Sequence, residues 1–416
     1  MARLPPAATQ LLPLRRSPLF GRDAERAQLE GIVPQARLLT LTGAPGSGKT
    51  RLALEVSERL APRFRDGVHV AELAAPLPAP VSVATSVGAA LGIEDTAGRG
   101  AEAAIAEALT EAELLLVLDD CGHVAGAAGE LAHHLLERCP QVRVLATSQV
   151  PLGVPGEQVW DVPALDVEPA VELFLDRAGL AGGDSRVDGP RGSPVEQICR
   201  RLDGLPLAVE LAAAWAGEHS LGELDGLLAA AVPGHQTMEA TVDWSYGLLG
   251  PAEQQLLDRL SVFTRGFVLH AAEHVAAMGD VPGLLGALVE HSLVLAVRAS
   301  ELTVRDMTEF CPLLDGPDGP MRYHLAEPVR RRAAEGLADQ GAEGATRRRH
   351  AEYFLEVARH CDVGLRGEYP GHVLFGLGQY EGNLRSALAW ARRHHRDLGL
   401  ELCIALAHFW ELRGRV

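Results

Sequence analysis

Short apolar runs alternate with helical stretches from residue 37 to about residue 162. Residues 49–64 place apolar side chains at helical spacing, directly after one such run. The runs themselves predict buried strands over 36–43, 67–73, 114–120 and 142–148, with 158–163 as a candidate fifth strand. Continuous apolar strands separated by helices are typical of a parallel sheet that is covered on both faces. We therefore predict an α/β domain in this region.

The strand pattern stops after about residue 165. Glycine and proline turns then separate short predicted helices over 169–179, 193–204, 205–217 and 220–231. The block 238–335 mixes helices with two candidate strands, 292–297 and 321–326. The sequence therefore predicts that an all-helical segment follows the sheet domain and that a mixed block follows that segment.

Residues 341–416 are again helical in pattern. Within 383–393, one helix face carries Leu384, Ala387, Leu388 and Ala391. The sequence stops without a helix-ending signal. Because helical repeat units need stacked neighbours to bury their faces, we expect this block to be the start of a longer repeat array.

Lysine and asparagine have almost vanished from this chain. Among the 38 lysine and arginine residues, Lys49 is the only lysine, and Asn383 is the only asparagine. This bias is typical of a GC-rich genome, in which arginine replaces lysine wherever charge alone is needed. A retained lysine therefore indicates a position that needs a compact ammonium group, which a planar guanidinium cannot replace.

Composition excludes several classes of protein. A net charge of −17 argues against a bare nucleic-acid-binding surface, which needs clustered cations. No run approaches the ~18 apolar residues of a membrane span, and residues 1–17 resemble a flexible lead-in more than a signal peptide. Six cysteines are far apart and form no CxxC pair, which favours free buried thiols over a disulfide framework or a zinc site: Cys121, Cys139, Cys199, Cys311, Cys361 and Cys403. We expect a cytoplasmic protein.

Residues 43–50, GAPGSGKT, match the phosphate-binding pattern GxxxxGK[ST] between a predicted strand and a predicted helix. Glycines let the backbone curl so that successive N–H groups bind phosphate oxygens. Lys49 is expected to contact the β- and γ-phosphates, and Thr50 to place its hydroxyl on Mg²⁺. The context and the single lysine disfavour a chance glycine-rich turn. The predicted nucleotide-binding residues here are Gly43, Ala44, Pro45, Gly46, Ser47, Gly48, Lys49, Thr50 and Arg51.

Two aspartates follow the apolar run 114–118. Asp119 lies at the predicted carboxyl end of a strand, where loops meet the ligand in such sheets, and we expect it to hold Mg²⁺, usually through water. Asp120 could polarise the attacking water, so that Asp120 and Lys49 are the candidate catalytic residues. A solvated acidic turn is the alternative, and for Asp120 the two interpretations stay open.

At this point the chain resembles a known family. Its motifs occur in the order seen in STAND ATPases, and the closest likeness is to the NB-ARC-like ATPase cores of large bacterial regulators of the LuxR and antibiotic-regulatory types. The resemblance covers nearly all of 15–416 and rests on the phosphate loop together with the segments 19–32, 114–124, 142–157, 204–214 and 260–276.

The resemblance implies an architecture and a switch. It implies a P-loop nucleotide-binding domain over 18–165, a small helical domain over 166–235, a winged-helix domain over 236–338 and the start of TPR-like helical repeats over 339–416. ADP would keep these modules closed, and a signal sensed by the repeats would admit ATP and favour self-association. Such a switch would regulate transcription through partners or attached domains.

The resemblance also suggests residues for the base. Phe20, Gly21 and Arg22 match the segment that surrounds the adenine, although a turn that leads into a helix is the alternative. Pro206 resembles the proline that packs against the adenine, and it could also act as a helix-starting proline.

Two positions depart from the family pattern. Where relatives carry an arginine that senses the γ-phosphate, this chain has Gln149, after Thr147 and Ser148. A neutral amide cannot give charge-assisted stabilisation, so a slow ATPase and a non-hydrolysing scaffold whose repeats bind proteins both stay open. The second departure lies at 325–327, where Leu-Ala-Glu stands in place of a Met-His-Asp segment that touches ADP in plant relatives.

We assign no binding or catalytic role to several other polar residues. His324 is one position away from the ADP-contacting histidine of plant relatives and is given no nucleotide role, and His123 is interpreted as structural. The basic runs in 330–336 and 347–353 are interpreted as solvated helix faces, since they are short and rich in Glu and Ala. In this family the winged helix resembles a regulatory clamp, so we expect no direct nucleic-acid contact. The lack of a long apolar run leads us to expect no membrane contact.

Overall fold

A five-stranded sheet forms the first part of the computed structural model, which describes residues 18–73, 83–93, 99–180, 193–231, 237–264, 266–298, 321–367 and 370–412. The strands are β1 (Leu38–Thr42), β2 (Val68–Glu72), β3 (Leu115–Asp119), β4 (Arg143–Thr147) and β5 (Gln158–Asp161). Their order is β2-β3-β4-β1-β5, and all neighbours are parallel. The predicted parallel sheet is therefore confirmed, including its candidate fifth strand.

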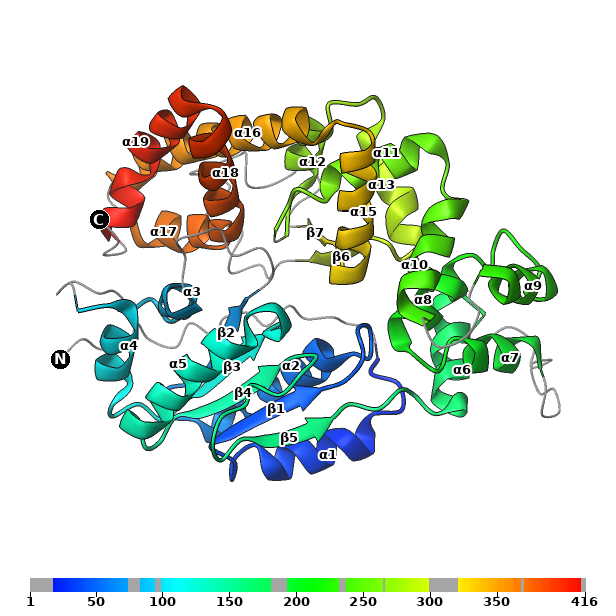
Figure 1. The fold of residues 1–416 in the computed structure, drawn as a ribbon, viewed down its shortest axis with the longest axis horizontal. Helices are drawn as coiled ribbons and strands as arrows, with labels where there is room; N and C mark the ends of the chain where they lie inside the picture. Colours follow the sequence, from blue (N-terminus) through cyan, green and yellow to red (C-terminus); the bar gives the residue numbers. More distant parts are fainter. Residues whose placement is uncertain are drawn as a thin grey trace.

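Helices cover both faces of this sheet (Figure 1). One face carries α1 (Asp23–Ile32), α2 (Lys49–Leu60) and the short η1 (Ala61–Arg63), and the other carries α3 (Val83–Leu91), α4 (Ala101–Leu109) and α5 (Ala125–Arg138), which follows η2 (Gly122–Val124). Along β3, Leu115 and Val117 pack on the α1–α2 side, whereas Leu116 and Leu118 pack on the α3–α5 side. Because successive side chains point to opposite faces, a strand buried on both sides is apolar throughout.

The strand order brings three chain segments together at the carboxyl edge of the sheet. β4 lies between β1 and β3, with Thr147 beside Leu41 and Ala146 beside Leu118. The loop after β1, the end of β3 and the end of β4 therefore meet, although they are far apart in the sequence. This edge is where open parallel sheets bind ligands.

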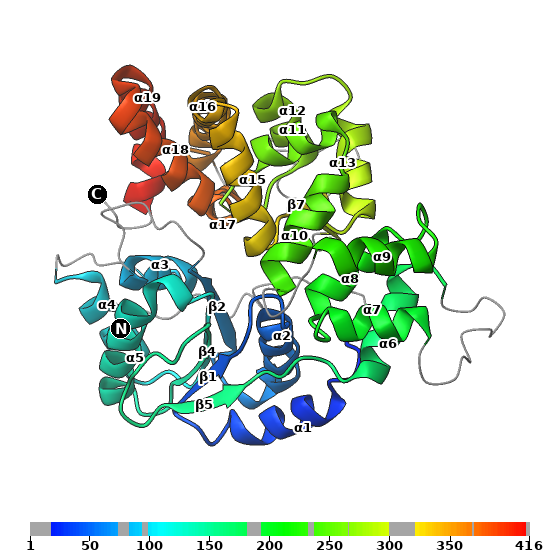
Figure 2. The same cartoon turned by 45° about the vertical axis from the view of Figure 1, so that its right-hand side comes forward.

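Helices make up almost all of the described chain after β5 (Figures 1 and 2). In Figure 1, α6–α9 lie to the right of the sheet and α10–α19 above it. A two-stranded antiparallel sheet pairs β6 with β7. The elements are α6 (Val167–Arg177), α7 (Pro194–Arg201), α8 (Pro206–Ala214), α9 (Leu221–Ala231), α10 (Thr237–Leu248), α11 (Pro251–Leu260), α12 (Leu269–Ala276), α13 (Val281–Glu290), β6 (Leu295–Arg298), β7 (Met321–His324), α15 (Glu327–Asp339), α16 (Glu343–Leu365), α17 (Pro370–Gly378), α18 (Glu381–His394) and α19 (Arg396–Leu412).

Element boundaries differ from the predicted ones for local reasons. The predicted helix 49–64 ends at Leu60, because Pro62 lacks the N–H that would continue it and the chain tightens into η1. The helix predicted over 193–204 begins one residue later, after Ser193, whose hydroxyl caps it by accepting the Glu196 N–H (3.2 Å). The strand predicted over 292–297 forms as β6 and starts at Leu295.

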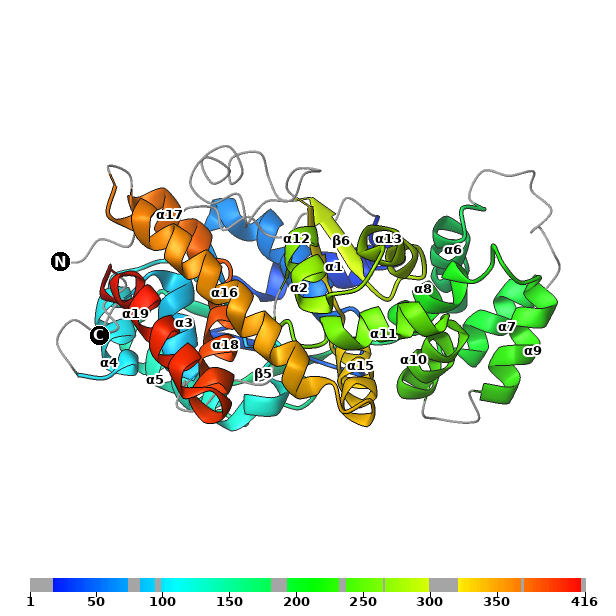
Figure 3. The ribbon, with the colours of Figure 1, turned by 90° about the horizontal axis from the view of Figure 1, so that it is seen from above.

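The long helix α16 packs against α17, α18 and α19, an arrangement seen from above in Figure 3. Asn383, on α18, is fully buried and connects this group to the turn after α11. Its side-chain oxygen accepts the Thr264 N–H (3.0 Å), and its amide donates to the Gly266 carbonyl (3.3 Å). Only an uncharged side chain that both donates and accepts can make these two hydrogen bonds.

Four described cysteines are buried free thiols, as predicted: Cys121, Cys139, Cys199 and Cys361. The prediction of burial is wrong for Cys403, which is exposed on α19, and Cys311 lies outside the described residues. Among the residues that the structure describes, no helix combines the length and the apolar character that a membrane crossing requires.

His350 lies inside an aromatic cluster on α16. It is 2% exposed, and its ring centroid lies 4.8 Å from that of Phe354 and 5.2 Å from that of Phe263. Within the described part of the chain, its Nε2 has no hydrogen-bond partner. Burial lowers the pKa of His350 to about 3, although a hydrogen bond with Asn383 acts in the opposite direction.

Acid should therefore destabilise the protein through His350. The folded state keeps the ring neutral down to its lowered pKa of about 3, whereas an unfolded chain takes up the proton near pH 6.5. The stabilisation is fully present above pH ~6.5 and is lost as the pH falls, by about 2 kcal/mol between pH ~6.5 and ~5. His350→Leu should remove this part of the pH dependence in urea unfolding at pH 7, 6 and 5. Equal slopes for the two proteins would contradict the assignment.

Candidate functional site

The glycine-rich turn 43–48 joins β1 to α2 at the carboxyl edge of the sheet. Gly46 and Gly48 have φ angles of +76° and +92°, which residues with a side chain rarely adopt. α2 begins directly at Lys49, so the N–H groups of its first turn and the positive end of its dipole face the turn. This arrangement is a ready anion-binding site.

Asp119, at the end of β3, accepts two hydroxyl hydrogen bonds on one oxygen. Thr50 Oγ1 donates to its Oδ1 at 2.7 Å, and Thr147 Oγ1 donates to the same atom at 2.6 Å. Burial raises the pKa of Asp119 to about 6, against the effect of these hydroxyls, and nearby Glu72 and Asp120 raise it further. The carboxylate therefore joins α2, β3 and β4 through these hydroxyls.

The Lys49 ammonium lies over the turn. Its Nζ donates to the carbonyl oxygens of Gly43 (2.9 Å) and Ala44 (2.8 Å). Burial lowers the pKa of Lys49, while the carboxylates of Asp120, Asp119 and Asp161 act in the opposite direction, in that order. An ammonium has three donors, so one N–H remains for a ligand oxygen.

Oxygen ligands near Asp119 fit a magnesium ion. The Thr50 hydroxyl and the Asp119 carboxylate are hard donors and lie within hydrogen-bond distance of each other. In the described ranges, no group of three or more His, Cys, Asp or Glu residues could hold a metal. An ion here would take few protein ligands and fill its shell with water and phosphate oxygens, the pattern that Mg²⁺ prefers.

The other candidates from the sequence lie around this centre. Asp120 has a φ of +59° and donates its N–H to Thr147 Oγ1 (2.9 Å). Gln149 is exposed, and its Cγ lies 3.7 Å from the position of a Cβ at Gly122. His123 is exposed in η2, and the His324 ring lies against Gly266.

A pocket opens beside the end of the glycine-rich turn. Apolar side chains form most of its wall, and the charged residues are Arg22, Arg51 and Glu210. Its lining residues are Leu19, Phe20, Arg22, Ser47, Gly48, Arg51, Leu52, Leu165, Leu173, Pro206 and Glu210. The structure thus brings Phe20, Arg22 and Pro206 together beside the turn.

The Arg22 side chain stabilises the glycine-rich turn through its backbone. Its guanidinium donates to the carbonyl oxygens of Ser47 (3.3 Å) and Pro163 (2.5 Å) and pairs with Glu25 (2.9 Å). The residue is 3% exposed. Gly21 has a φ of +59°, and a Cβ there would lie 2.3 Å from Pro169. This segment therefore lines the pocket and also leads into α1.

Two helices of the second part of the chain rest on the turn itself. The Leu207 N–H, in α8, donates to the Gly46 carbonyl (3.2 Å). A Cβ at Gly46 would lie 2.5 Å from Met238 Sδ and 3.1 Å from Leu207 Cβ. A side chain at position 46 would require the Met238 side chain to move and would be strained at the positive φ of this residue.

Sequence reasoning missed several residues of this site, namely Thr147, Glu72, Asp161, Glu210, Leu207 and Met238. A signal existed for the first three: every strand of the sheet ends in a polar residue, Thr42, Glu72, Asp119, Thr147 and Asp161. Polar ends on apolar strands indicate a ligand edge. No local pattern marks Glu210 or Met238, because helices from the second part of the chain carry them.

The two basic runs are neutralised within the molecule. Arg331 pairs with Glu239 (3.1 Å), and Arg332 pairs with Asp243 (2.6 Å) and lies 3.9 Å from the centre of the Tyr246 ring. The remaining arginines bond likewise, Arg330 to Glu327, Arg347 to Glu343, Arg348 to Glu352 and Arg349 to the Val275 carbonyl. Arg331, Arg332 and Arg349 thus connect helices, and the other three arginines pair within their own helix.

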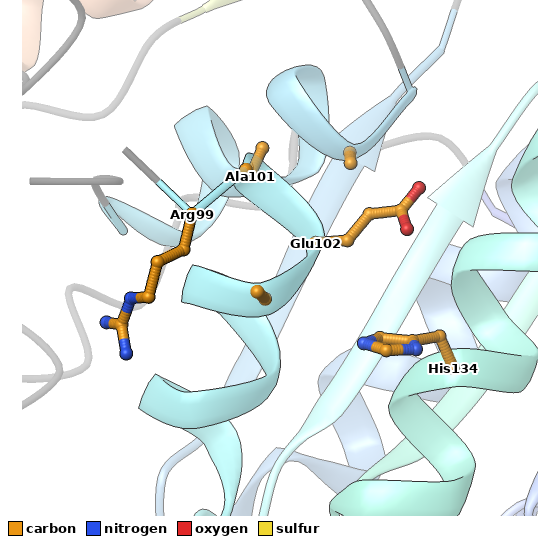
Figure 4. Close-up of a pocket in the computed structure, with 7 residues that line it drawn as sticks. Arg99, Ala101, Glu102 and His134 are labelled. Carbon is orange, nitrogen blue, oxygen red and sulfur yellow. The ribbon is translucent and has the colours of Figure 1, made fainter. Parts of the chain in front are cut away.

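A second hollow lies away from this edge, where α4 begins (Figure 4). Its lining residues are Ala84, Arg99, Gly100, Ala101, Glu102, Ala103 and His134. It contains none of the residues singled out by the sequence and none of the contacts described above.

No protein-family model matches the chain. It is 36% identical over 400 residues to Rv0890c of Mycobacterium tuberculosis, which is named as an HTH-type transcriptional regulator, and the match covers 92% of this chain and 43% of the regulator. It is 34% identical over 367 residues to the uncharacterized protein Rv0894 of the same species, covering 83% of this chain and 88% of that protein. It is 26% identical over 328 residues to regulatory protein AfsR of Streptomyces coelicolor, covering 71% of this chain and 32% of AfsR. The chain thus spans less than half the length of the two named regulators.

Among solved structures, the fold is similar to a signal transduction ATPase with numerous domains (STAND) that has a tetratricopeptide repeat sensor, PH0952 of Pyrococcus horikoshii. The TM-score is 0.55, the identity is 16%, and the match covers 98% of this chain and 64% of that one. At this identity the likeness is one of fold.

Lys49→Ala should weaken binding of a phosphate-bearing ligand at least tenfold with little change in thermal stability, because Nζ contacts two loop carbonyls and supports no core. Titration of labelled ADP, with circular dichroism to follow unfolding, measures both quantities. Lys49→Arg is the matched control: it keeps the charge but not the compact ammonium, and it should also bind weakly. Equal affinities in all three proteins would contradict a phosphate role for the turn.

Proposed function

The chain belongs to the STAND-class P-loop ATPases of large bacterial regulators, and from this membership we propose that it is a nucleotide-gated regulatory switch that binds ATP or ADP with Mg²⁺ and hydrolyses ATP slowly. One observation carries the proposal: the glycine-rich turn, the Thr50–Asp119 pair and an apolar pocket adjoin one another. The turn suits phosphates, the Thr50–Asp119 pair suits a magnesium ion, and the apolar pocket suits a base.

Each group then has a role in binding. N–H groups of the turn and of the first turn of α2 bind the phosphate oxygens, and Lys49 contacts the outer phosphates. Thr50 and Asp119 hold Mg²⁺, which when bound neutralises phosphate charge. Phe20, Gly21 and Pro206 surround the base, and Arg22 keeps the turn in place through the Ser47 carbonyl.

Chemistry in this site would be slow. We assign to Asp120, beside Asp119, the role of polarising a water. Gln149 is exposed and neutral, so it gives a transferring phosphate no charge-assisted hydrogen bond. The same observation favours the second candidate function, a scaffold that holds nucleotide without hydrolysis while its helical repeats bind protein partners.

The helical part supplies the regulatory side of the proposal. We assign a small helical domain to 166–235, a winged-helix clamp to 236–338 and the start of TPR-like repeats to 339–416. Leu207 and Met238 contact the turn, so movement of α8 or α10 would alter the phosphate site. Transcription would be controlled through partners, self-association or attached domains, without direct nucleic-acid contact by this segment, because its two arginine runs are paired internally.

The direct test is the nucleotide that stays bound through purification, identified by mass after denaturation, followed by titration with ATP and ADP. ADP or ATP at near one equivalent, or submicromolar affinity for either, supports the switch. A protein that carries no nucleotide and binds neither would contradict both candidate functions.

Asp119→Asn should weaken Mg²⁺-dependent ATP binding more than Mg²⁺-free ADP binding, since a carboxylate that holds the ion matters only when the ion is present. Removal of the charge should cost about tenfold or more in the presence of Mg²⁺. Affinities measured with Mg²⁺ and with EDTA give the ratio. Asp161→Asn is a matched control at the end of β5, and it should leave that ratio nearly unchanged. Equal losses in both conditions for Asp119→Asn would make Asp119 structural.

Gln149→Arg should raise the rate of ATP turnover, because a positioned arginine contributes several powers of ten to phosphoryl transfer. The wild type should turn over well below the ~1–100 s⁻¹ of kinases. Single-turnover hydrolysis at saturating Mg²⁺-ATP compares the two proteins. Fast hydrolysis by the wild type would contradict the scaffold function. An unchanged slow rate in the variant would show that Gln149 does not limit the chemistry.

A further inference from the structure

Among the residues that the structure describes, Glu210 is the one acidic residue in the wall of the pocket beside the glycine-rich turn. It lies on α8, one helical turn after Pro206, and its side chain is 12% exposed. Apolar residues, among them Phe20, Leu165 and Leu173, line the same pocket. A carboxylate in such a place needs hydrogen-bond donors around it.

Existing partners engage only one of its two oxygens. Arg177 donates to Oε1 from both Nε and Nη2, at 3.1 Å each, and Arg51 Nη1 lies 3.9 Å from the same atom. Within the part of the chain that the structure describes, both of these hydrogen bonds end on Oε1 and none ends on Oε2. This oxygen can accept a hydrogen bond from a ligand in the pocket.

Most other polar groups in the wall are already engaged. The Arg22 guanidinium bonds to the carbonyls of Ser47 and Pro163 and to Glu25, and Arg51 Nη2 donates to the Pro18 carbonyl at 2.6 Å. Ser47 Oγ is buried and has no partner among the described residues. A ligand that fills the pocket therefore meets one strong acceptor, Glu210, and it should present a donor there.

Position decides which donor this is. Arg51 directly follows Thr50 in the first turn of α2, and its Nη1 lies 3.9 Å from Glu210 Oε1. Glu210 therefore lines the same pocket as Gly48 and Arg51, which adjoin the expected phosphate site. The ribose is the part of a nucleotide that adjoins the phosphates, whereas the base extends away from them. A ribose offers only hydroxyls, and a carboxylate accepts from these as the acidic residue does in dinucleotide-binding folds.

We propose that Glu210 accepts a hydrogen bond from a ribose hydroxyl of the bound nucleotide and so makes the site selective for ribonucleotides over deoxyribonucleotides. This rests on the proposed nucleotide binding at the same site. Arg177 holds the carboxylate in orientation through Oε1 and leaves Oε2 for the sugar. Hydrogen bonds to a charged acceptor are among the stronger ones, so the loss of a hydroxyl should lower affinity about tenfold or more.

The test measures the affinities of ADP, 2′-deoxy-ADP and 3′-deoxy-ADP for the wild type, Glu210→Ala and Glu210→Gln by calorimetry. The wild type should bind at least one deoxynucleotide about tenfold more weakly than ADP. Glu210→Ala should bind ADP and that deoxynucleotide equally, and Glu210→Gln should discriminate less than the wild type. A ratio of affinities, unlike an affinity, does not change when a variant merely folds less well.

Arg177→Gln is the matched control, because it breaks the same ion pair but keeps the Glu210 carboxylate, and it should reduce the discrimination less than Glu210→Ala does. Purine riboside diphosphate, which lacks the exocyclic amino group, separates the base from the sugar. If Glu210→Ala lost the preference for ADP over purine riboside diphosphate but kept the preference for ADP over the deoxynucleotides, the ribose assignment would be overturned. If the wild type bound ADP and both deoxynucleotides with equal affinity, the inference would be overturned and the proposed nucleotide binding would remain. Absence of all binding would remove both.

Discussion

The two hydroxyl hydrogen bonds on Asp119 Oδ1 are the contact on which the rest of the site depends. One comes from Thr50 at the start of α2 and the other from Thr147 at the end of β4. A glycine-rich turn has high conformational entropy, and these bonds fix its downstream end to the sheet. The cost is a partly buried carboxylate whose pKa is raised to about 6 by burial. A site that holds a carboxylate with a raised pKa beside an anion-binding turn is suited to a ligand that brings its own cation.

The sheet by itself does not complete the pocket. Pro206, Leu207, Glu210 and Met238 come from the helical part, and they close the side of the turn that the sheet leaves open. A ligand in the pocket therefore contacts both parts of the molecule at once. Bound ligand favours the arrangement in which both parts contact it over one in which they are apart. The size of this shift is set by the difference in ligand affinity between the two arrangements. This is the physical basis of the proposed nucleotide-gated switch.

Rare residues show how composition and structure inform one another. Lys49 and Asn383 are the only members of their types in the chain. Lys49 reaches two carbonyls of the turn, a place for a compact ammonium. Asn383 joins α18 to the turn after α11 with one donor and one acceptor in a buried position, which neither an arginine nor a carboxylate could provide. In a chain that discards both residue types elsewhere, each is retained where its own hydrogen-bonding chemistry is needed.

Local patterns in the sequence determined the strands, the glycine-rich turn and the acidic strand end. Apolar runs, glycine spacing and the prolines act between residues that are close in the chain, so the parallel sheet, including the stretch 158–163, could be predicted without coordinates. The strand order could not, because it depends on how far-apart segments pack, and it alone places Thr147 beside Asp119. The engagement of Arg22 with the backbone was likewise hidden, since a guanidinium that is expected near a base and one that holds a loop look the same in a sequence. Helix periodicity records that a face is buried but not against what. Only the tertiary structure therefore placed Met238 on the turn and Glu210 in the pocket, because complementary packing between distant helices decides both.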